Sequence, residues 1–197
     1  MPEQAGGTLR FFSFSDWSFR KKDVYYGKSP KNRGRSVSKM KVLFVCTGNT
    51  CRSAMCEAYF NSLSRKNGTE ERLSARSAGT DAWDGEESSP FTRTALAPYH
   101  TDIADHSARR LTRKMLEESD LIVPMTASHR ERILRLLPEA ADRVRLLGEF
   151  REGGVRDVSD PYGGTAEIYS LCFADMKGPL DRMYLELSKK TPKTGVK

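Results

Sequence analysis

The hydrophobic positions of the chain alternate between two spacings. Residues 41–45 read Lys-Val-Leu-Phe-Val, an apolar run of strand length that is typical of a strand buried on both faces of a parallel sheet. From Ser53 the apolar residues recur at helical spacing until the breaker Asn67-Gly68. The first unit is therefore predicted to be a strand, a loop and a helix.

The same alternation continues along the chain. Further strands are predicted at residues 73–78, 121–125 and 144–147, and further helices at 90–97, 112–118, 128–137 and 165–187. This order predicts an α/β fold, with an open four-stranded parallel sheet, helices on both faces and right-handed crossovers. Pro124 fits a central strand poorly, because proline donates no ladder hydrogen bond.

Composition narrows the class of protein. The 197 residues are 38% hydrophobic, which suits one ordinary domain, and no apolar run approaches the roughly 18 residues that span a bilayer. The chain has four cysteines and no apolar segment shaped like a secretory signal, so we expect no disulfide scaffold. A reducing, cytoplasmic location is predicted.

The positive charge is concentrated at one end. Residues 1–39 hold nine basic and three acidic residues, a net +6 of the total +7. Basic residues interleaved with aromatics suit single-stranded nucleic acid or an anionic membrane, and an acid-poor leader also suits a transit peptide. We favour a disordered tail or an upstream start before a natural beginning at Met40. The main domain is then expected at 40–187 and a Lys-rich end at 188–197, with no nucleic acid bound by the core.

The loop after the first strand carries the candidate chemistry, because ligands of open parallel sheets bind at the carboxyl ends of strands. Cys46 ends the strand and Arg52 follows six positions later, at a helix start. Loop amides and the helix N-terminus form a concave site for a tetrahedral oxyanion, to which arginine adds a two-pronged donor. This positive field predicts a thiol pKa lowered from about 8.5 toward about 5 to 7. A thiolate beneath a bound phosphate is a nucleophile aimed at phosphorus.

Two other kinds of site are excluded or disfavoured. No Gly-Lys-Ser/Thr follows the loop, which excludes a Walker-type nucleotide site. Cys46, Cys51 and Cys56 step by five and the histidines are remote in sequence, which disfavours zinc.

The loop resembles the signature of the low-molecular-weight protein phosphatases, and the resemblance extends from Met40 to about Leu187. The residues that carry it are Val45-Cys46-Thr47-Gly48-Asn49-Thr50-Cys51-Arg52-Ser53, Ser77-Ala78-Gly79-Thr80, His106-Ser107-Ala108-Arg109-Arg110-Leu111-Thr112, Asp120-Leu121-Ile122-Val123 and Asp160-Pro161-Tyr162-Gly163-Gly164. Several motifs in order are far more specific than the loop alone.

The resemblance implies a metal-independent, cofactor-free reaction on a phosphorylated protein. Cys46 would attack phosphorus and form a cysteinyl-phosphate, while Arg52 and the loop amides hold the equatorial oxygens. Asp160, on a loop made rigid by Pro161, would protonate the leaving group and then activate water.

The remaining site residues follow from the same resemblance. Predicted substrate-binding residues are Thr47, Gly48, Asn49, Thr50, Cys51, Trp83 and Tyr162. A polar network of Asn49, Ser53, Ser77 and His106 would hold the loop amides inward. For His106 a surface or satisfied core position stays open, and for Trp83 ordinary packing does. Cys51 is either a resolving thiol for oxidised Cys46 or part of the wall, and Cys56 and Cys172 are expected in the core.

Two positions point to the substrate. Relatives directed at phosphotyrosine usually carry an apolar residue at the position of Thr50 and a second aromatic at the position of Gly163. This chain instead resembles the bacterial protein arginine phosphatases, and a hydroxyl at Thr50 suits a polar guanidinium better than an aromatic ring. We favour phosphoarginine, with phosphotyrosine as the alternative.

Two further alternatives carry less weight. A thioredoxin-coupled arsenate reductase needs an additional cysteine pair, and residues 126–147 contain none. A non-catalytic phosphate-binding module would not need Cys46, Arg52 and Asp160 together. The oligomeric state is not predicted.

Overall fold

The computed structural model describes residues 39–190, so residues 1–38 of the predicted tail and 191–197 of the Lys-rich end lie outside it. Its centre is a parallel sheet in the order β2-β1-β3. The elements are β1 (Met40–Cys46), α1 (Arg52–Lys66), β2 (Leu73–Gly79), α2 (Pro90–Leu96), α3 (Arg113–Glu117), β3 (Leu121–Pro124), α4 (Ala127–Leu136) and α5 (Ala166–Lys190). Within the described range, no helix is both long and apolar enough to cross a bilayer.

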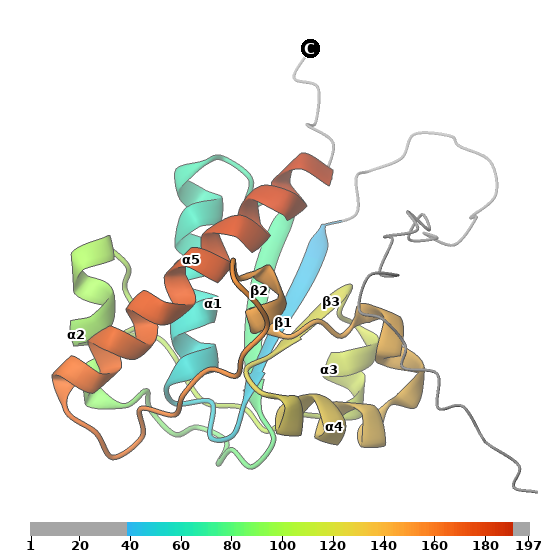
Figure 1. Ribbon diagram of the computed structural model, residues 1–197, viewed down its shortest axis with the longest axis horizontal. Coiled ribbons are helices and arrows are strands. Elements are labelled where there is room, and N and C mark those ends of the chain that lie inside the picture. The colour runs from blue at the N-terminus through green and yellow to red at the C-terminus, as the bar shows by residue number, and fades with distance from the viewer. Residues whose placement is uncertain (1–38, 191–197) are drawn as a thin grey trace, which may run out of the picture. The chain divides into compact units, whose positions relative to one another are not determined.

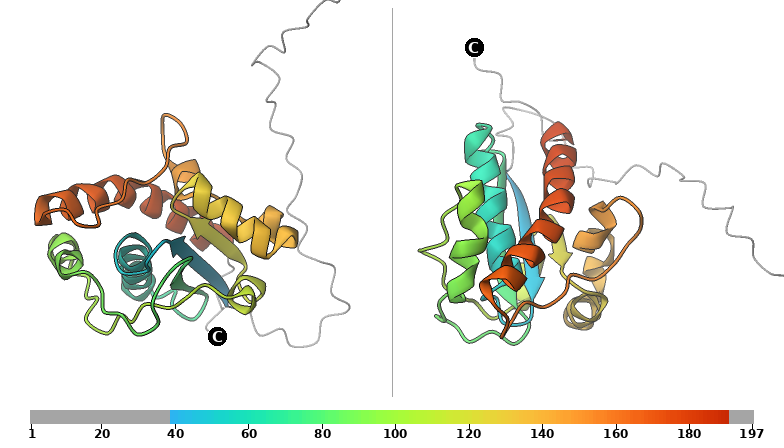
Figure 2. Two further views of the ribbon diagram at one scale, coloured as in Figure 1. Left: turned by 90° about the horizontal axis from the view of Figure 1, so that it is seen from below. Right: turned by 60° about the vertical axis from the view of Figure 1, so that its left-hand side comes forward.

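The side chains of β1 contribute alternately to two hydrophobic cores. Val42 and Phe44 belong to the core beneath α1, α2 and α5, whereas Leu43 and Val45 belong to the core beneath α3 and α4. Figures 1 and 2 show these two groups of helices on opposite faces of the sheet. Burial on both faces explains the uninterrupted apolar run of this strand. The predicted α/β fold with helices on both faces is confirmed.

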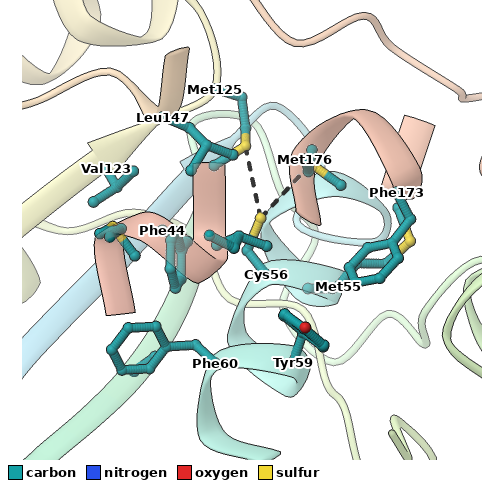
Figure 3. Packing of buried hydrophobic residues seen from close by; sticks show 14 of the residues in the cluster. Phe44, Met55, Cys56, Tyr59, Phe60, Val123, Met125, Leu147, Phe173 and Met176 are labelled. Carbon is teal, nitrogen blue, oxygen red and sulfur yellow. Dashed lines mark hydrogen bonds between the residues drawn. The ribbon is translucent and has the colours of Figure 1, made fainter. Parts of the chain in front are cut away.

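The larger core fixes the first turns of α1. Figure 3 shows Cys56 between two methionines, with its Sγ 4.0 Å from Met125 Sδ and 3.7 Å from Met176 Sδ. Phe44 of β1 packs edge-on against Phe60 of α1, with ring centroids 6.0 Å apart. Cys56 is therefore a core residue, as expected. This packing holds the start of α1 at the carboxyl edge of the sheet.

The prediction of a fourth strand at residues 144–147 is wrong. Val144 forms a single parallel bridge with Ile122, and Arg145 N donates to Ile122 O at 3.0 Å. The 3-10 helix η2 (Pro138–Arg143) ends directly before this bridge, and η3 (Leu147–Phe150) begins soon after it. The interval between them is too short for a ladder, so the sheet of the described residues has three strands.

Pro124 lies at the end of β3 without disrupting the sheet. Met125 N donates to Val45 O of β1 at 3.0 Å. Because successive backbone groups of a strand point to opposite sides, the position of the missing N–H of Pro124 faces away from β1. The proline therefore costs the ladder no hydrogen bond.

Gly79, the last residue of β2, lies directly against the loop that follows β1. A Cβ atom there would lie 2.4 Å from Thr47 O, 2.9 Å from Asn49 N and 2.8 Å from Ala82 Cβ. Two of these atoms belong to the backbone, so no rotamer change would relieve the contact. Glycine at this position lets β2 and the loop approach each other closely.

Gly79→Ala should lower the free energy of unfolding by about 2 kcal/mol, because the new methyl forces the loop and the strand apart. Urea denaturation of the two proteins measures the difference. Gly178→Ala is the matched control, since its Cβ would have only Arg182 Nη2, at 3.7 Å, within 4 Å. In a helix that exchange should be neutral or stabilising. Equal stability of Gly79→Ala and the wild type would contradict the close approach.

Candidate active site

The loop between β1 and α1 forms one side of a cavity of about 320 Å³. Its lining residues are Cys46, Thr47, Gly48, Thr50, Cys51, Arg52, Asp81, Trp83, Glu86, Asp160 and Tyr162. The cavity brings together the three residues predicted to be catalytic, although Asp160 lies more than a hundred positions from the loop. Of the predicted substrate-binding residues, only Asn49 does not line it.

Asn49 belongs to the loop, but its side chain is buried, and the residue takes part in four hydrogen bonds. Its Nδ2 donates to Ser53 Oγ at 2.9 Å and to Ser77 Oγ at 2.7 Å. Its Oδ1 accepts from Arg109 N at 2.9 Å, and its carbonyl oxygen lies 2.7 Å from His106 Nε2. The residues predicted to support the loop, Ser53, Ser77 and His106, therefore all contact Asn49.

A carboxylate behind this network was not predicted. Ser77 Oγ donates to Glu57 Oε2 at 2.5 Å, and Arg109 Nη2 lies 3.4 Å from the same carboxylate. Glu57 lies on α1. The network therefore joins the loop to α1, to β2 and to the segment that contains Arg109.

Cys46 is almost completely buried at the end of β1, and its Sγ lies 2.9 Å from Ser53 Oγ. Burial raises the pKa of this thiol, whereas hydrogen bonds from the Ser53 hydroxyl and from the Ser53 and Asn49 amides, with the charge of Arg52, act in the opposite direction. Burial has the largest effect, so the expected lowering of the thiol pKa is not found. Because Ser53 Oγ already accepts from Asn49, its own proton is free to donate to the sulfur.

Arg52 is buried at the first position of α1 and faces the Asp160 loop. Its Nη2 lies 2.5 Å from Asp160 Oδ2, and its Nη1 donates to Val158 O at 3.2 Å. Its Nε is buried and has no hydrogen-bond partner among residues 39–190. Arg52 thus lines the cavity with donors to spare, the Nε among them.

The second carboxylate oxygen of Asp160 is held by its own loop. Its Oδ1 accepts from the backbone N of Tyr162 at 3.2 Å, across Pro161. About half of its side chain is exposed. The carboxylate is therefore fixed in position but accessible from the cavity.

The outer walls of the cavity are aromatic and acidic. Trp83 is 80% exposed and Tyr162 is 74% exposed, although both line the cavity, so neither serves as core packing. Asp81 and Glu86 line the same cavity and were not predicted. Asp81 is paired with Arg132, whose Nη2 lies 2.7 Å from Asp81 Oδ1.

Thr50 and Cys51 lie in the deeper part of the loop and are both buried. Ser89 N donates to Thr50 O at 2.9 Å. Cys51 Sγ lies 2.9 Å from Ser89 Oγ and 3.2 Å from Tyr169 OH. Burial, together with the hydrogen bond to Cys51, raises the pKa of Tyr169 to about 12. Cys51 lines the cavity wall with its thiol engaged, and its role as a resolving thiol stays a prediction.

His129 is the main residue that the sequence did not reveal. Its Nε2 lies 2.9 Å from Thr47 Oγ1 and its Nδ1 lies 2.8 Å from Thr126 Oγ1, the N-cap of α4. Burial, followed by the charge of Arg52, lowers its pKa to about 4, so the ring is neutral at pH 7. The sequence did contain a signal for this residue, since the polar pair Thr126 and His129 follows β3. The carboxyl ends of parallel strands share one edge, so this pair could be expected near the loop that follows β1.

The free energy of unfolding of His129→Gln should decrease less at acidic pH than that of the wild type. The pKa of His129 falls from 6.5 in the unfolded chain to about 4 in the folded one, so the unfolded chain binds more protons between these values. Stability that is fully present above pH 6.5 is therefore lost as the pH falls toward 4, by about 2 to 3 kcal/mol. Urea denaturation at pH 7 and pH 4.5 should give a smaller difference for the variant than for the wild type.

The exposed His100 provides the control for this measurement. His100→Asn should keep the full pH dependence of the wild type, since asparagine tolerates the left-handed backbone of this position, where φ is 51°. Identical pH dependence of the His129 variant and the wild type would show that this ring is not held neutral by the fold.

The sequence is similar to that of known phosphatases. The family described as "Low molecular weight phosphotyrosine protein phosphatase" matches residues 41–193. A protein-arginine-phosphatase of Bacillus subtilis is 35% identical over 150 residues, which are 76% of this chain and 98% of the relative. A low molecular weight protein-tyrosine-phosphatase of Streptomyces coelicolor is 38% identical over 138 residues, which are 67% and 84% of the two chains.

A solved structure agrees with the sequence relatives. A cysteine-to-serine mutant of the YwlE arginine phosphatase, with a phosphorylated active-site serine, has a TM-score of 0.71 and 34% identity, covering 76% of this chain and 97% of its own. The family match spans well over half of the chain and includes the loop, its supporting network and the Asp160 segment. The chain therefore belongs to the low molecular weight phosphotyrosine protein phosphatase family, and is a cysteine-dependent, metal-independent protein phosphatase, as members of that family are.

Proposed function

We propose that the chain hydrolyses its substrate through a cysteinyl-phosphate on Cys46. The observation that carries the proposal is the single cavity lined by Cys46, Arg52 and Asp160. In the first step the sulfur anion attacks phosphorus, the bond to the leaving group breaks, and Asp160 gives that group a proton. In the second step Asp160 removes a proton from water, the water oxygen attacks phosphorus, and the bond between sulfur and phosphorus breaks, which releases inorganic phosphate and the sulfur anion of Cys46.

The phosphorylated serine of the YwlE mutant supports this chemistry, because a phosphoryl group there rests on a residue that replaces a cysteine. In this chain the Ser53 hydroxyl and the charge of Arg52 would stabilise the Cys46 anion once its proton is lost. The amides of Asn49 and Ser53 support the same anion.

Arg52 would bind the transferring phosphoryl group. Its buried, unused Nε supplies one donor, and the Nη2 that now holds Asp160 supplies another once phosphate competes for it. A phosphate dianion that takes over this guanidinium also leaves a negative charge beside Asp160, which favours the protonated carboxyl that an acid catalyst needs. Substrate binding and acid catalysis are thereby coupled through one ion pair.

We propose phosphoarginine in proteins as the preferred substrate. Thr50 offers a hydroxyl where an apolar residue would suit an aromatic ring. Glu86 lines the cavity and would attract a guanidinium, while Arg52 serves the phosphate. The two arginine phosphatase relatives from Bacillus subtilis and Geobacillus stearothermophilus add support.

Phosphotyrosine is the second candidate, and the aromatic walls favour it. Trp83 and Tyr162 are largely exposed at the cavity and would stack on a tyrosine ring. The Streptomyces coelicolor relative, named a tyrosine phosphatase, is as similar as the arginine phosphatases. Parallel hydrolysis of phosphoarginine and phosphotyrosine peptides distinguishes the two.

We also propose residues 40–187 as the catalytic domain, on the strength of the family match over 41–193. A cytoplasmic location is proposed as well, supported by four cysteines that are all free and buried.

Asp160→Asn should reduce hydrolysis of substrates with poor leaving groups by about a hundredfold or more, because no proton reaches the departing atom. An activated aryl phosphate, whose leaving group departs without a proton, should lose much less. Steady-state rates on a phosphopeptide and on the aryl phosphate measure the two effects. Equal losses on both substrates would remove Asp160 from the acid role.

Thr50→Ile should lower the ratio of phosphoarginine to phosphotyrosine turnover by about tenfold or more. The exchange keeps the β-branch but replaces a hydroxyl with apolar surface, a change of about 1 to 3 kcal/mol between polar and aromatic ligands, and 1.4 kcal/mol is about a factor of ten in rate. The kcat/KM values of matched peptides measure the ratio, with inorganic phosphate affinity as the control for an intact loop. An unchanged ratio would make tyrosine the better assignment.

A further inference from the structure

A groove lies beside the active-site cavity, against the segment that carries Asp160. It measures about 220 Å³ and is lined by Val158, Ser159, Asp160, Pro161, Ile168, Leu171, Cys172 and Asp175. Asp160 lines both hollows, whereas Pro161 lines only the groove and Tyr162 only the cavity. The groove and the active site are therefore contiguous.

The groove presents apolar side chains to the outside. Ile168 is 46% exposed and Leu171 is 70% exposed, and their spacing of three puts both on one face of α5. Val158 and Pro161 line it from the facing segment. Burial raises the pKa of the Cys172 thiol to about 12, so this lining group is uncharged at neutral pH.

The two carboxylates of the groove already have partners. Asp160 is paired with Arg52, and Asp175 accepts from Arg151 and Arg156 at 2.6 Å each. What the groove offers without a partner is apolar surface, and a hollow lined by apolar side chains beside a site suits an apolar part of a ligand.

We propose that this groove binds an apolar side chain of the substrate polypeptide, within three residues of the phosphorylated residue. A phosphorylated side chain in the cavity brings its own neighbours to the cavity mouth, and an extended chain advances about 3.3 Å per residue. Because Asp160 lines both hollows, the groove begins directly beside the cavity. The inference rests on the proposed hydrolysis of phosphorylated residues in polypeptides, whether the residue is arginine or tyrosine.

A leucine scan tests the groove. The host is a phosphorylated peptide with alanine at the three positions on each side, and each flanking position is changed to leucine in turn. At least one leucine should raise kcat/KM of the wild-type protein about three- to tenfold, because part of its side chain leaves water. Leu171→Glu should abolish this gain, while its turnover of the all-alanine peptide and of a small aryl phosphate stays within about twofold of the wild type.

Leu185→Glu is the matched control, because Leu185 is 53% exposed on the same helix but does not line the groove. This variant should keep the full leucine gain. The proposal is wrong if no leucine position gives a gain, if the gain survives in Leu171→Glu, or if Leu185→Glu loses it equally.

Peptide binding, measured without turnover, tests the groove independently of the proposed reaction. The same peptides should bind the Cys46→Ser protein, which lacks the thiol nucleophile, with the same leucine preference, and the added Leu171→Glu change should remove it. A leucine preference in binding without any turnover would contradict the proposed reaction but support the groove. Light scattering tests whether a second copy of the chain occupies the groove instead. If the wild-type protein is a dimer and Leu171→Glu is a monomer, the groove belongs to a dimer interface and the proposal is wrong.

Discussion

The hydrogen bonds of Asn49 hold the active-site loop in an uncommon conformation on which the site depends. Asn49 has a φ of 58°, in the left-handed region that asparagine tolerates better than most residues. Its side chain holds Ser53 and Ser77, and its carbonyl oxygen meets His106. The loop amides can then turn toward the sulfur of Cys46 instead of toward solvent. The loop is thus already in the conformation that the proposed anion site needs, as preorganised catalysis requires.

The second constraint is the burial of charge at one edge of the sheet. Burial disfavours the anion of Cys46, whereas the charge of Arg52 and the Ser53 hydroxyl favour this anion. Arg52 in turn donates to Asp160 and to Val158 O, and its buried Nε has no hydrogen-bond partner among residues 39–190. Nearby His129 is neutral, so it adds no second cation near Arg52. Arg52 is the one cation among the described residues that line the cavity, so a phosphate bound as proposed would compete for it with Asp160, the proposed acid.

Much of the fold could be predicted because it depends on local patterns, and the loop of the site likewise, whereas distant site residues such as Asp160 and His106 were expected only from the family resemblance. The apolar run of β1 needs only burial on two faces, and Cys46 and Arg52 are near in sequence. The strand expected at 144–147 failed because Val144 and Leu146 are buried within irregular backbone between two 3-10 helices, and burial alone does not distinguish that from a strand. His129 escaped notice because its contact with Thr47 depends on how α4 packs. The thiol pKa went in the unexpected direction because depth of burial is a property of the tertiary structure.

The most direct measurement is the chemical identity of the reaction intermediate. The protein is mixed with an aryl phosphate, quenched in acid within the first turnover and digested, and the peptides are analysed by mass spectrometry. The account predicts one phosphoryl group on the peptide that contains Cys46, bound through sulfur, and its disappearance once the substrate is exhausted. Turnover with no phosphoryl group on Cys46, or with the group on another residue, would contradict the account.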